Sequence, residues 1–229
     1  MSSVAIVTGV SSGLGLELAL GFPAEVNHVI GISRKRPADP RWLALGQKHQ
    51  VTHVMGDVAD SDVVSRAFSE ACKIGLPTVL INVAGQGVFG PAGNYTKNDL
   101  DDVLRGNLVG LILFCERAIA DFRKSGGGTI VNVMSTAAHI GRAGEAIYCA
   151  AKWGARGYTE SIRAEMKGSP VRVIGAYPGG MKTSFWSAAR GTTTDSSKFM
   201  EAKDVAAIIL AAIRSPKGTY VSDIIINRG

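Results

Sequence analysis

The chain has 229 residues, of which 46% are hydrophobic and 19% charged, so it is long enough to bury a core and is not a disordered tail. Its 25 basic and 19 acidic residues leave a net charge of +6 that is spread along the chain, which argues against a nucleic-acid-binding face. No apolar run approaches the roughly 18 residues of a membrane span, no basic region precedes the N-terminal apolar run, and three cysteines without a Cys-x-x-Cys spacing argue against disulfides or zinc. We therefore expect a cytoplasmic protein that binds no nucleic acid, membrane or metal.

Short apolar runs alternate with segments of helical periodicity in the first half of the chain. Asp60 or Ser61 is a suitable N-cap for one of these helices. The pattern predicts strands over 4–7, 26–33, 51–55 and 78–83, and helices over 14–20, 39–48 and 60–73.

The second half continues this alternation. It predicts one or two helices over 97–123, helices over 145–167 and 202–214, and strands over 129–134, 171–176 and 220–226. Strands separated by helices indicate right-handed crossovers and a doubly wound, Rossmann-type parallel sheet of about seven strands with helices on both faces. We expect one α/β domain over 1–229, with ligands bound beyond the carboxyl ends of the strands.

A glycine-rich turn follows the first predicted strand. Its glycines allow a diphosphate to approach the backbone, and the following helix offers free N–H groups. The Gly-x3-Gly-x-Gly spacing differs from G-x-G-x-x-G, and the missing Gly-Lys-Ser/Thr ending excludes a nucleoside-triphosphate loop. A turn needed only for packing is the alternative. The candidate cofactor residues here are Gly9, Ser11, Ser12, Gly13, Leu14 and Gly15.

The second predicted strand ends at Ser33-Arg34, followed by Lys35 and Arg36. An acidic residue at this position would bind the ribose hydroxyls of NAD and repel a 2′-phosphate, whereas a guanidinium suits that phosphate. The sequence therefore favours NADP(H), with NAD(H) possible; a solvated basic turn is the alternative. Asp57-Val58, after the third strand, either flanks the adenine or caps the next helix.

Small residues end the fourth predicted strand at Asn82-Val83-Ala84-Gly85. Asn82, Ala84 and Gly85 are candidate cofactor residues because small side chains leave room for a flat ring system. A tight turn alone is the alternative.

Tyr148 and Lys152 lie four residues apart and therefore share one face of the predicted long helix. A nearby ammonium favours the phenolate, so we expect it to lower the pKa of Tyr148 and make the phenol a usable acid or base. Ser135 ends the fifth strand, where its hydroxyl could hold a substrate oxygen, and Asn107 lies in an apolar helical stretch where its amide needs partners. Each of these patterns alone also fits a residue without a catalytic role.

Together these motifs, with Pro178-Gly179, resemble the short-chain dehydrogenase/reductase family in order and spacing over almost the whole chain. The resemblance implies hydride transfer between the nicotinamide of NADP(H) and a ketone, aldehyde or alcohol. It implies that Tyr148 is the general acid or base, that Lys152 lowers the pKa of Tyr148 and binds the nicotinamide ribose, and that Ser135 orients the substrate oxygen. Asn107 would hold a water in a proton relay with Lys152.

The resemblance also implies that the cofactor contacts Ser33, Arg34, Asp57, Val58, Pro178, Gly179, Met181 and Thr183. Many NADP-using members carry a basic residue where this chain has Ser12, and the usual Asn-Asn-Ala-Gly is Asn-Val-Ala-Gly here. The first difference weakens the preference for NADP(H), and Arg34 keeps it.

The segment 184–200 occupies the place of the family's substrate lid. Phe185 and Trp186 either cover an apolar substrate or anchor the lid, and His139 is a further substrate candidate beside Ser135 and Tyr148. The resemblance implies a homodimer or homotetramer formed through the helices that carry Asn107 and Tyr148. A non-catalytic NADP(H)-binding regulatory protein of the same fold is the alternative function, and a sugar epimerase or dehydratase is a weaker one.

Overall fold

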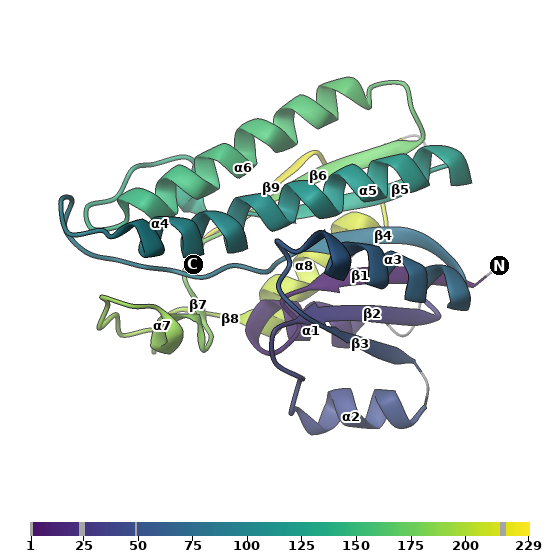
Figure 1. The fold of residues 1–229 in the computed structure, drawn as a ribbon, viewed down its shortest axis with the longest axis horizontal. Coiled ribbons are helices and arrows are strands. Elements are labelled where there is room, and N and C mark those ends of the chain that lie inside the picture. Colours follow the sequence, from purple (N-terminus) through teal and green to yellow (C-terminus); the bar gives the residue numbers. More distant parts are fainter. Residues whose placement is uncertain (1, 23–25, 49, 216–218) are drawn as a thin grey trace.

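Parallel strands form the centre of the computed structural model, which describes residues 2–22, 26–48, 50–215 and 219–229 (Figure 1). Seven strands pair in the order β3-β2-β1-β4-β5-β6-β9, and every pair is parallel. Their bounds are β1 Ser3–Thr8, β2 His28–Ser33, β3 Val51–Met55, β4 Leu76–Asn82, β5 Gly128–Val133, β6 Val171–Pro178 and β9 Asp223–Ile226. The predicted doubly wound sheet is confirmed.

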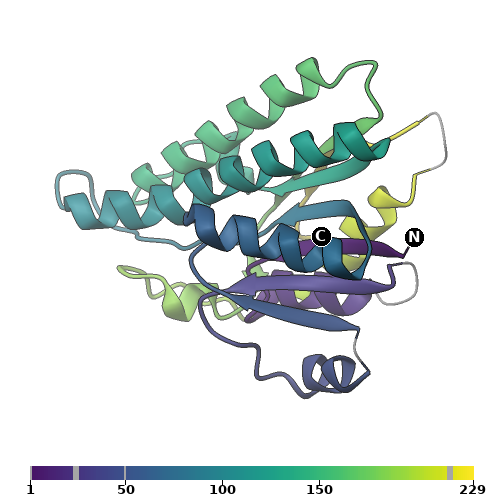
Figure 2. The same cartoon turned by 45° about the vertical axis from the view of Figure 1, so that its right-hand side comes forward.

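Helices cover both faces of this sheet, and each face has its own apolar core. One core joins the sheet to α3, α5 and α6, which Figure 2 shows as one layer; the other joins it to α1, α2 and α8. The bounds are α1 Gly13–Gly21, α2 Pro40–Gln47, α3 Ser61–Ile74, α4 Lys97–Leu104, α5 Gly110–Ser125, α6 Ala146–Glu165 and α8 Ala202–Ile213. Among the described helices, none combines the length and apolar character that crossing a membrane requires.

Local sequence signals explain where several helices begin and end. The Asp60 carboxylate accepts a hydrogen bond from the Asp62 amide at the start of α3, and Thr96 and Asp99 form a reciprocal capping box at the start of α4. Gly126 ends α5 in the left-handed conformation (φ +91°), which costs a glycine little.

The helical stretch 97–123 is two helices, α4 and α5, as one of the two predicted possibilities has it, and a π-helical segment, Arg105–Val109, joins them. The last strand begins at Asp223 rather than at residue 220, because its pairing with β6 starts where Asp223 lies opposite Gly175.

The segment between β6 and α8 forms a small separate layer. It holds the short strands β7 (Met181–Lys182) and β8 (Met200–Glu201), which pair with each other, and the one-turn helix α7 (Phe185–Ala188). Figure 1 shows α7 and β7 at the lower left, below α4 and the left-hand end of α6 and apart from the main sheet. This layer contains the predicted lid, residues 184–200.

The direction in which successive strands are added to the sheet reverses between β1 and β4. From β1 the chain moves outward to β2 and β3, then returns to place β4 on the other side of β1. Such a switch point leaves a crevice at the carboxyl ends of the two neighbouring strands, where ligands bind in open α/β sheets.

Substitution of Gly15 tests how tightly the turn after β1 packs. A Cβ atom on Gly15 would lie 2.3 Å from the Gly9 carbonyl oxygen. We expect Gly15→Ala to lower the free energy of unfolding by about 1–3 kcal/mol, because backbone atoms must move to admit the methyl group. Urea unfolding measures this change.

Gly157→Ala is the matched control. Gly157 is exposed on α6 and a Cβ atom there would meet nothing within 4 Å, so the control should gain about 0.5–1 kcal/mol. Equal stability of Gly15→Ala and the wild type would contradict the tight contact.

Candidate active site

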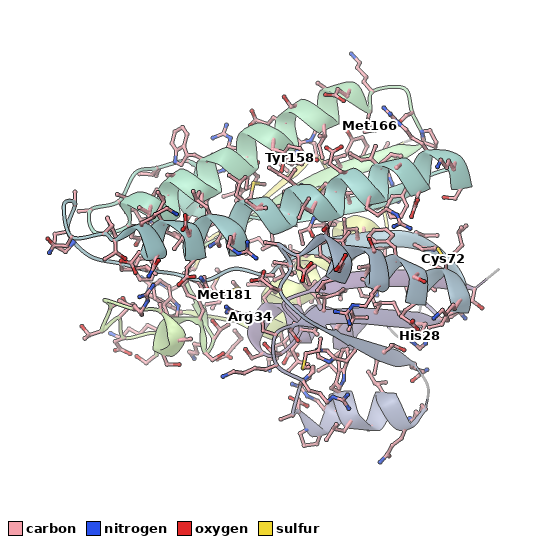
Figure 3. The ribbon with its side chains drawn as sticks, viewed as in Figure 1. His28, Arg34, Cys72, Tyr158, Met166 and Met181 are labelled. Atoms are coloured by element: carbon pink, nitrogen blue, oxygen red, sulfur yellow. The ribbon has the colours of Figure 1, made fainter. Side chains whose placement is uncertain are left out.

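A cavity of about 1050 Å³ lies at the switch point, along the carboxyl ends of β1, β2, β4, β5 and β6 and under the lid. It brings together most of the residues singled out from the sequence. Figure 3 shows two of them, Arg34 and Met181, on the same side of the molecule although they are far apart in sequence. The sequence-predicted residues that line it are Gly9, Ser11, Ser12, Gly13, Leu14, Gly15, Ser33, Arg34, Asp57, Val58, Ala84, Gly85, Asn107, Ser135, Tyr148, Lys152, Pro178, Gly179, Met181, Thr183, Phe185 and Trp186.

The turn after β1 is held against the turn after β4. The Thr8 hydroxyl accepts hydrogen bonds from the amides of Val83 (2.9 Å) and Ala84 (3.1 Å). Gly9 has φ +78°, and a Cβ atom there would lie 2.9 Å from the Ala84 backbone. The glycines are therefore needed for packing, and they also leave the N-terminus of α1 open to the cavity. These free amides and the helix dipole suit an anion.

The turn after β2 supplies positive charge to the same cavity. Arg34, Lys35 and Arg36 line it, and the Arg34 guanidinium donates a hydrogen bond to the Gln86 side-chain oxygen (3.1 Å). Asp57 lines the cavity beyond β3 and accepts a hydrogen bond from the Ala59 amide (2.9 Å) within the turn before α3. The N-cap of α3 is Asp60, so the alternative that Asp57 caps this helix is wrong.

Ser135, Tyr148, Lys152 and Asn107 gather beside the carboxyl ends of β4 and β5. Lys152 is only 4% exposed, and its ammonium donates to the Val133 carbonyl oxygen (3.4 Å). No carboxylate pairs with it among the described residues. A charged amine is thus held in an apolar surrounding with one weak acceptor, which is costly.

The Asn107 side chain is fixed from one side and open on the other. Its Nδ2 atom donates to the carbonyl oxygens of Gln86 (2.8 Å) and Val103 (2.9 Å). Its Oδ1 atom is buried without a partner in the described part of the chain. A Cβ atom on Gly85 would lie 2.5 Å from this oxygen and 3.6 Å from Lys152 Nζ, so the acceptor and the amine face the same small space.

The structure corrects the expected direction of the Tyr148 pKa. Burial is the largest influence and raises the pKa of Tyr148 above its usual value, while its hydrogen bond with Ser135 acts in the opposite direction. Burial also lowers the pKa of Lys152 to about 8. Lys152 Nζ lies 5.7 Å from the Tyr148 ring centroid, so its attraction for a phenolate does not outweigh desolvation.

Aromatic side chains form the wall next to Tyr148. The Phe185 ring lies 5.8 Å from the Tyr148 ring and 5.3 Å from the Trp186 ring. Trp186 stacks on Phe89 at 5.9 Å and donates its indole N–H to the Met181 carbonyl oxygen (3.0 Å). Both lid residues therefore line the cavity and anchor the lid.

Polar side chains also hold the lid on both sides of the cavity. The hydroxyls of Ser12 and Ser184 are 2.8 Å apart, and Arg190 forms ion pairs with Asp99 (2.6 Å) and Asp102 (3.3 Å) at α4. The lid thus spans the cavity from the turn after β1 to α4.

Two sequence-predicted residues lie outside the cavity lining. His139 packs its ring on Tyr177 (4.4 Å between centroids), and its Nδ1 atom accepts a hydrogen bond from Arg156 (2.8 Å). Asn82 is buried behind the cavity and donates to Asn132 Oδ1 (2.9 Å), which joins β4 to β5. Neither side chain is placed to touch a ligand in the cavity.

Sequence reasoning missed several residues that line the cavity: Gln86, Arg105, Arg142 and Glu145. Glu145 precedes Tyr148 by three residues, and burial raises the pKa of its carboxyl group. Gln86 follows the small-residue turn and bonds to both Arg34 and Asn107. Nearness to a recognised motif was the available signal for Gln86, for Glu145 and for Arg105, which lies two residues before Asn107. Arg142 carries no such signal.

Comparison with known proteins agrees with this arrangement. Residues 3–194 match the family described as short chain dehydrogenase. A sepiapterin reductase of Chlorobaculum tepidum is 27% identical over 99% of this chain and 96% of its own length. A short-chain dehydrogenase/reductase structure from Vibrio parahaemolyticus is 31% identical, with TM-score 0.82 over 98% of this chain and 100% of that one.

Two more distant structures show the same fold with a cofactor bound. An alcohol dehydrogenase of Thermococcus sibiricus complexed with 5-hydroxy-NADP has TM-score 0.86 at 19% identity, covering 99% of this chain and 96% of that one. A Burkholderia phymatum structure in complex with NAD has TM-score 0.87 at 21% identity, covering 98% and 88%.

The parallel sheet, the glycine turn at its switch point and the tyrosine–lysine helix define a dinucleotide-dependent oxidoreductase. The chain belongs to the short-chain dehydrogenase/reductase family.

Lys152→Met tests the burial of the amine. Because the pKa of Lys152 falls from 10.5 to about 8 on folding, the unfolded chain holds this proton more tightly, and the cost of burying the charge is largest below pH 8. That cost disappears as the pH rises toward about 10, so wild-type stability should rise relative to Lys152→Met by up to about 3 kcal/mol across this range.

Urea unfolding of both proteins between pH 7 and pH 10 measures the difference. A difference that stays constant with pH would show that the amine is not desolvated in the folded protein.

Proposed function

We propose that this enzyme transfers hydride between NADP(H) and a small ketone, aldehyde or alcohol, with Tyr148 as the general acid or base. The observation that carries the proposal is that one cavity joins the anion-binding turn after β1, the basic turn after β2 and the Ser135–Tyr148–Lys152 group. We further propose that residues 1–229 act as a single domain whose lid is 184–200.

The residues present fit a dinucleotide. The free amides at the start of α1 suit the diphosphate, and Arg34, with no acidic residue beside it, suits a 2′-phosphate. The unpartnered Asn107 Oδ1 and the Lys152 amine face the space beside Gly85, where small residues leave room for a flat ring and its ribose. When bound, the nicotinamide gives or accepts the hydride.

The side chains of this protein then manage the proton and the substrate oxygen. In reduction, the Tyr148 hydroxyl donates its proton to the carbonyl oxygen, and the Ser135 hydroxyl holds that oxygen in place. A raised pKa keeps the phenol protonated before the reaction and also makes it a weaker acid, so the phenolate that forms needs stabilisation. Lys152 stabilises the phenolate left behind, and Asn107 supports proton return from solvent.

The substrate enters beside aromatic side chains. Phe185, whose ring lies next to the Tyr148 ring, and Trp186 form an apolar wall of the cavity, and the lid excludes water when substrate is bound. One relative is a sepiapterin reductase, and we propose that this enzyme likewise acts in the direction of reduction.

We also propose that the protein is cytoplasmic and forms a homodimer or homotetramer through α5 and α6. Trp153 on α6 is 48% exposed and Val109, just before α5, is 39% exposed, which leaves apolar surface for a second copy.

Titration calorimetry with NADPH and then NADH, at one salt concentration, tests the cofactor assignment. Tighter binding of NADPH supports it. Equal binding would mean that the basic turn does not contact the cofactor, and binding of neither would overturn the dinucleotide site.

Tyr148→Phe should retain NADPH binding within about twofold and lose about 100- to 10,000-fold in kcat, because only the proton donor is removed. NADPH oxidation with a panel of ketones and aldehydes measures turnover. The control Tyr158→Phe removes a hydroxyl from the same helix that bonds Glu116 outside the cavity (2.7 Å), and it should keep full activity. Substantial turnover by Tyr148→Phe would exclude it as the acid.

Arg34→Ala should weaken NADPH binding by about tenfold or more and leave NADH binding nearly unchanged, because a charge-assisted hydrogen bond to the 2′-phosphate is lost. Calorimetry with both cofactors measures the two constants. Arg123→Ala, at the exposed end of α5, is the charge-matched control. The same loss with both cofactors would argue against a 2′-phosphate site at Arg34.

A further inference from the structure

One histidine is connected by hydrogen bonds to the basic turn, Arg34–Arg36, but does not line the cavity. His53 is on β3, opposite Gly31 of β2 in the parallel register, so it shares a face of the sheet with Ser33 two residues further on. Its Nε2 atom is 2.9 Å from the Ser33 hydroxyl oxygen. That hydroxyl is also 2.7 Å from the Lys35 carbonyl oxygen.

These two distances determine where the protons are. The Lys35 carbonyl can only accept, so the single hydroxyl proton of Ser33 points to it. The hydroxyl oxygen must then accept from His53, whose Nε2 atom carries the ring proton. Burial and the charge of Arg36 lower the pKa of His53, so the ring stays neutral in this one tautomer.

The chain of hydrogen bonds runs from the sheet to the turn. His53 sets the orientation of the Ser33 hydroxyl, and the hydroxyl ties the Lys35 carbonyl back to the end of β2. The residues on either side of that carbonyl are Arg34 and Arg36, which line the cavity. Both side chains are exposed, so the position of their guanidinium groups depends on the backbone of the turn that carries them.

We propose that His53 is a positioning residue for cofactor selectivity, which holds the Arg34–Arg36 turn in the shape that receives the 2′-phosphate. The proposal rests on the proposed use of NADP(H). The diphosphate cradle is the turn after β1, and the hydrogen bonds from His53 through Ser33 to Lys35 do not include that turn. Loss of His53 should therefore weaken NADPH binding more than NADH binding.

A second histidine within the same pair of strands, β2 and β3, offers a control that distinguishes a role in cofactor selectivity from a general role in holding the two strands together. His28 Nε2 is 2.9 Å from the Thr52 hydroxyl, which also joins β2 to β3. Figure 3 shows His28 well away from Arg34, as expected for the first residue of a strand that Arg34 follows. Thr52→Val is therefore a matched control, since it removes a β2–β3 hydrogen bond that does not reach the turn.

The experiment measures the dissociation constants of NADPH and NADH by calorimetry for the full chain and its variants, with urea unfolding as a check of folding. His53→Leu should bind NADPH about fivefold more weakly, with NADH changed by less than about twofold. His53→Gln should restore NADPH binding, because its amide nitrogen can occupy the place of Nε2 and donate to Ser33. Thr52→Val should keep the wild-type ratio of the two constants.

A double-mutant cycle makes the test specific. If His53 acts through the Ser33 hydroxyl, His53→Leu should have no further effect on the ratio in a Ser33→Ala background. If His53→Leu does not fold, Ser33→Ala alone should give the same selective loss.

The remaining outcomes are distinct. If Arg34→Ala lowers NADPH selectivity and neither His53→Leu nor Ser33→Ala does, the inference is wrong and the proposed function stands. Failure of His53→Gln to restore binding also overturns it. If Arg34→Ala leaves the ratio unchanged too, the NADP(H) assignment itself fails.

Discussion

The close contact between the backbone after β1 and the backbone after β4 is the constraint on which the site depends. One buried hydroxyl, on Thr8, accepts two amide hydrogen bonds from the opposite turn, and the missing side chain of Gly9 lets the two segments touch. The pairing of β1 with β4 ends at Val7 and Ile81, and this contact continues the attachment of the two segments beyond the strands. The contact therefore sets how far the anion cradle lies from the small-residue turn and, through it, from Asn107 and Lys152.

The catalytic group combines a charged amine and a phenol that are both removed from water. The Lys152 amine is buried with no carboxylate paired to it among the described residues, and the Tyr148 phenol is desolvated. Burial lowers the pKa of Lys152 and raises the pKa of Tyr148, so the charged form of each group is disfavoured and becomes easier to form when a compensating charge arrives. An arrangement of this kind responds strongly to what binds beside it, because the surroundings screen the added charge very little.

Much of the fold and part of the site could be predicted from sequence, because the informative residues are close together along the chain. The Gly9–Gly15 turn and the Tyr148–Lys152 spacing each lie within one strand–helix connection or one helix face. Features that need distant contacts could not be predicted. The direction of the Tyr148 pKa depends on burial, and the side chain of Gln86 meets Arg34 across the cavity. His139 follows Ser135 closely, yet the turn after β5 directs its ring to Tyr177 instead of the cavity.

The π-helical segment Arg105–Val109 has a consequence for how this part of the chain can vary. A π turn accommodates one more residue than an α turn, and one residue corresponds to about 100° of rotation in an α-helix. Deleting a residue here would restore a regular helix, but it would rotate α5 relative to α4. Either the buried Phe114 and Phe122 of α5 or the Asn107 amide would then lose its place. The length of this segment is therefore constrained even where its exposed side chains are free to change.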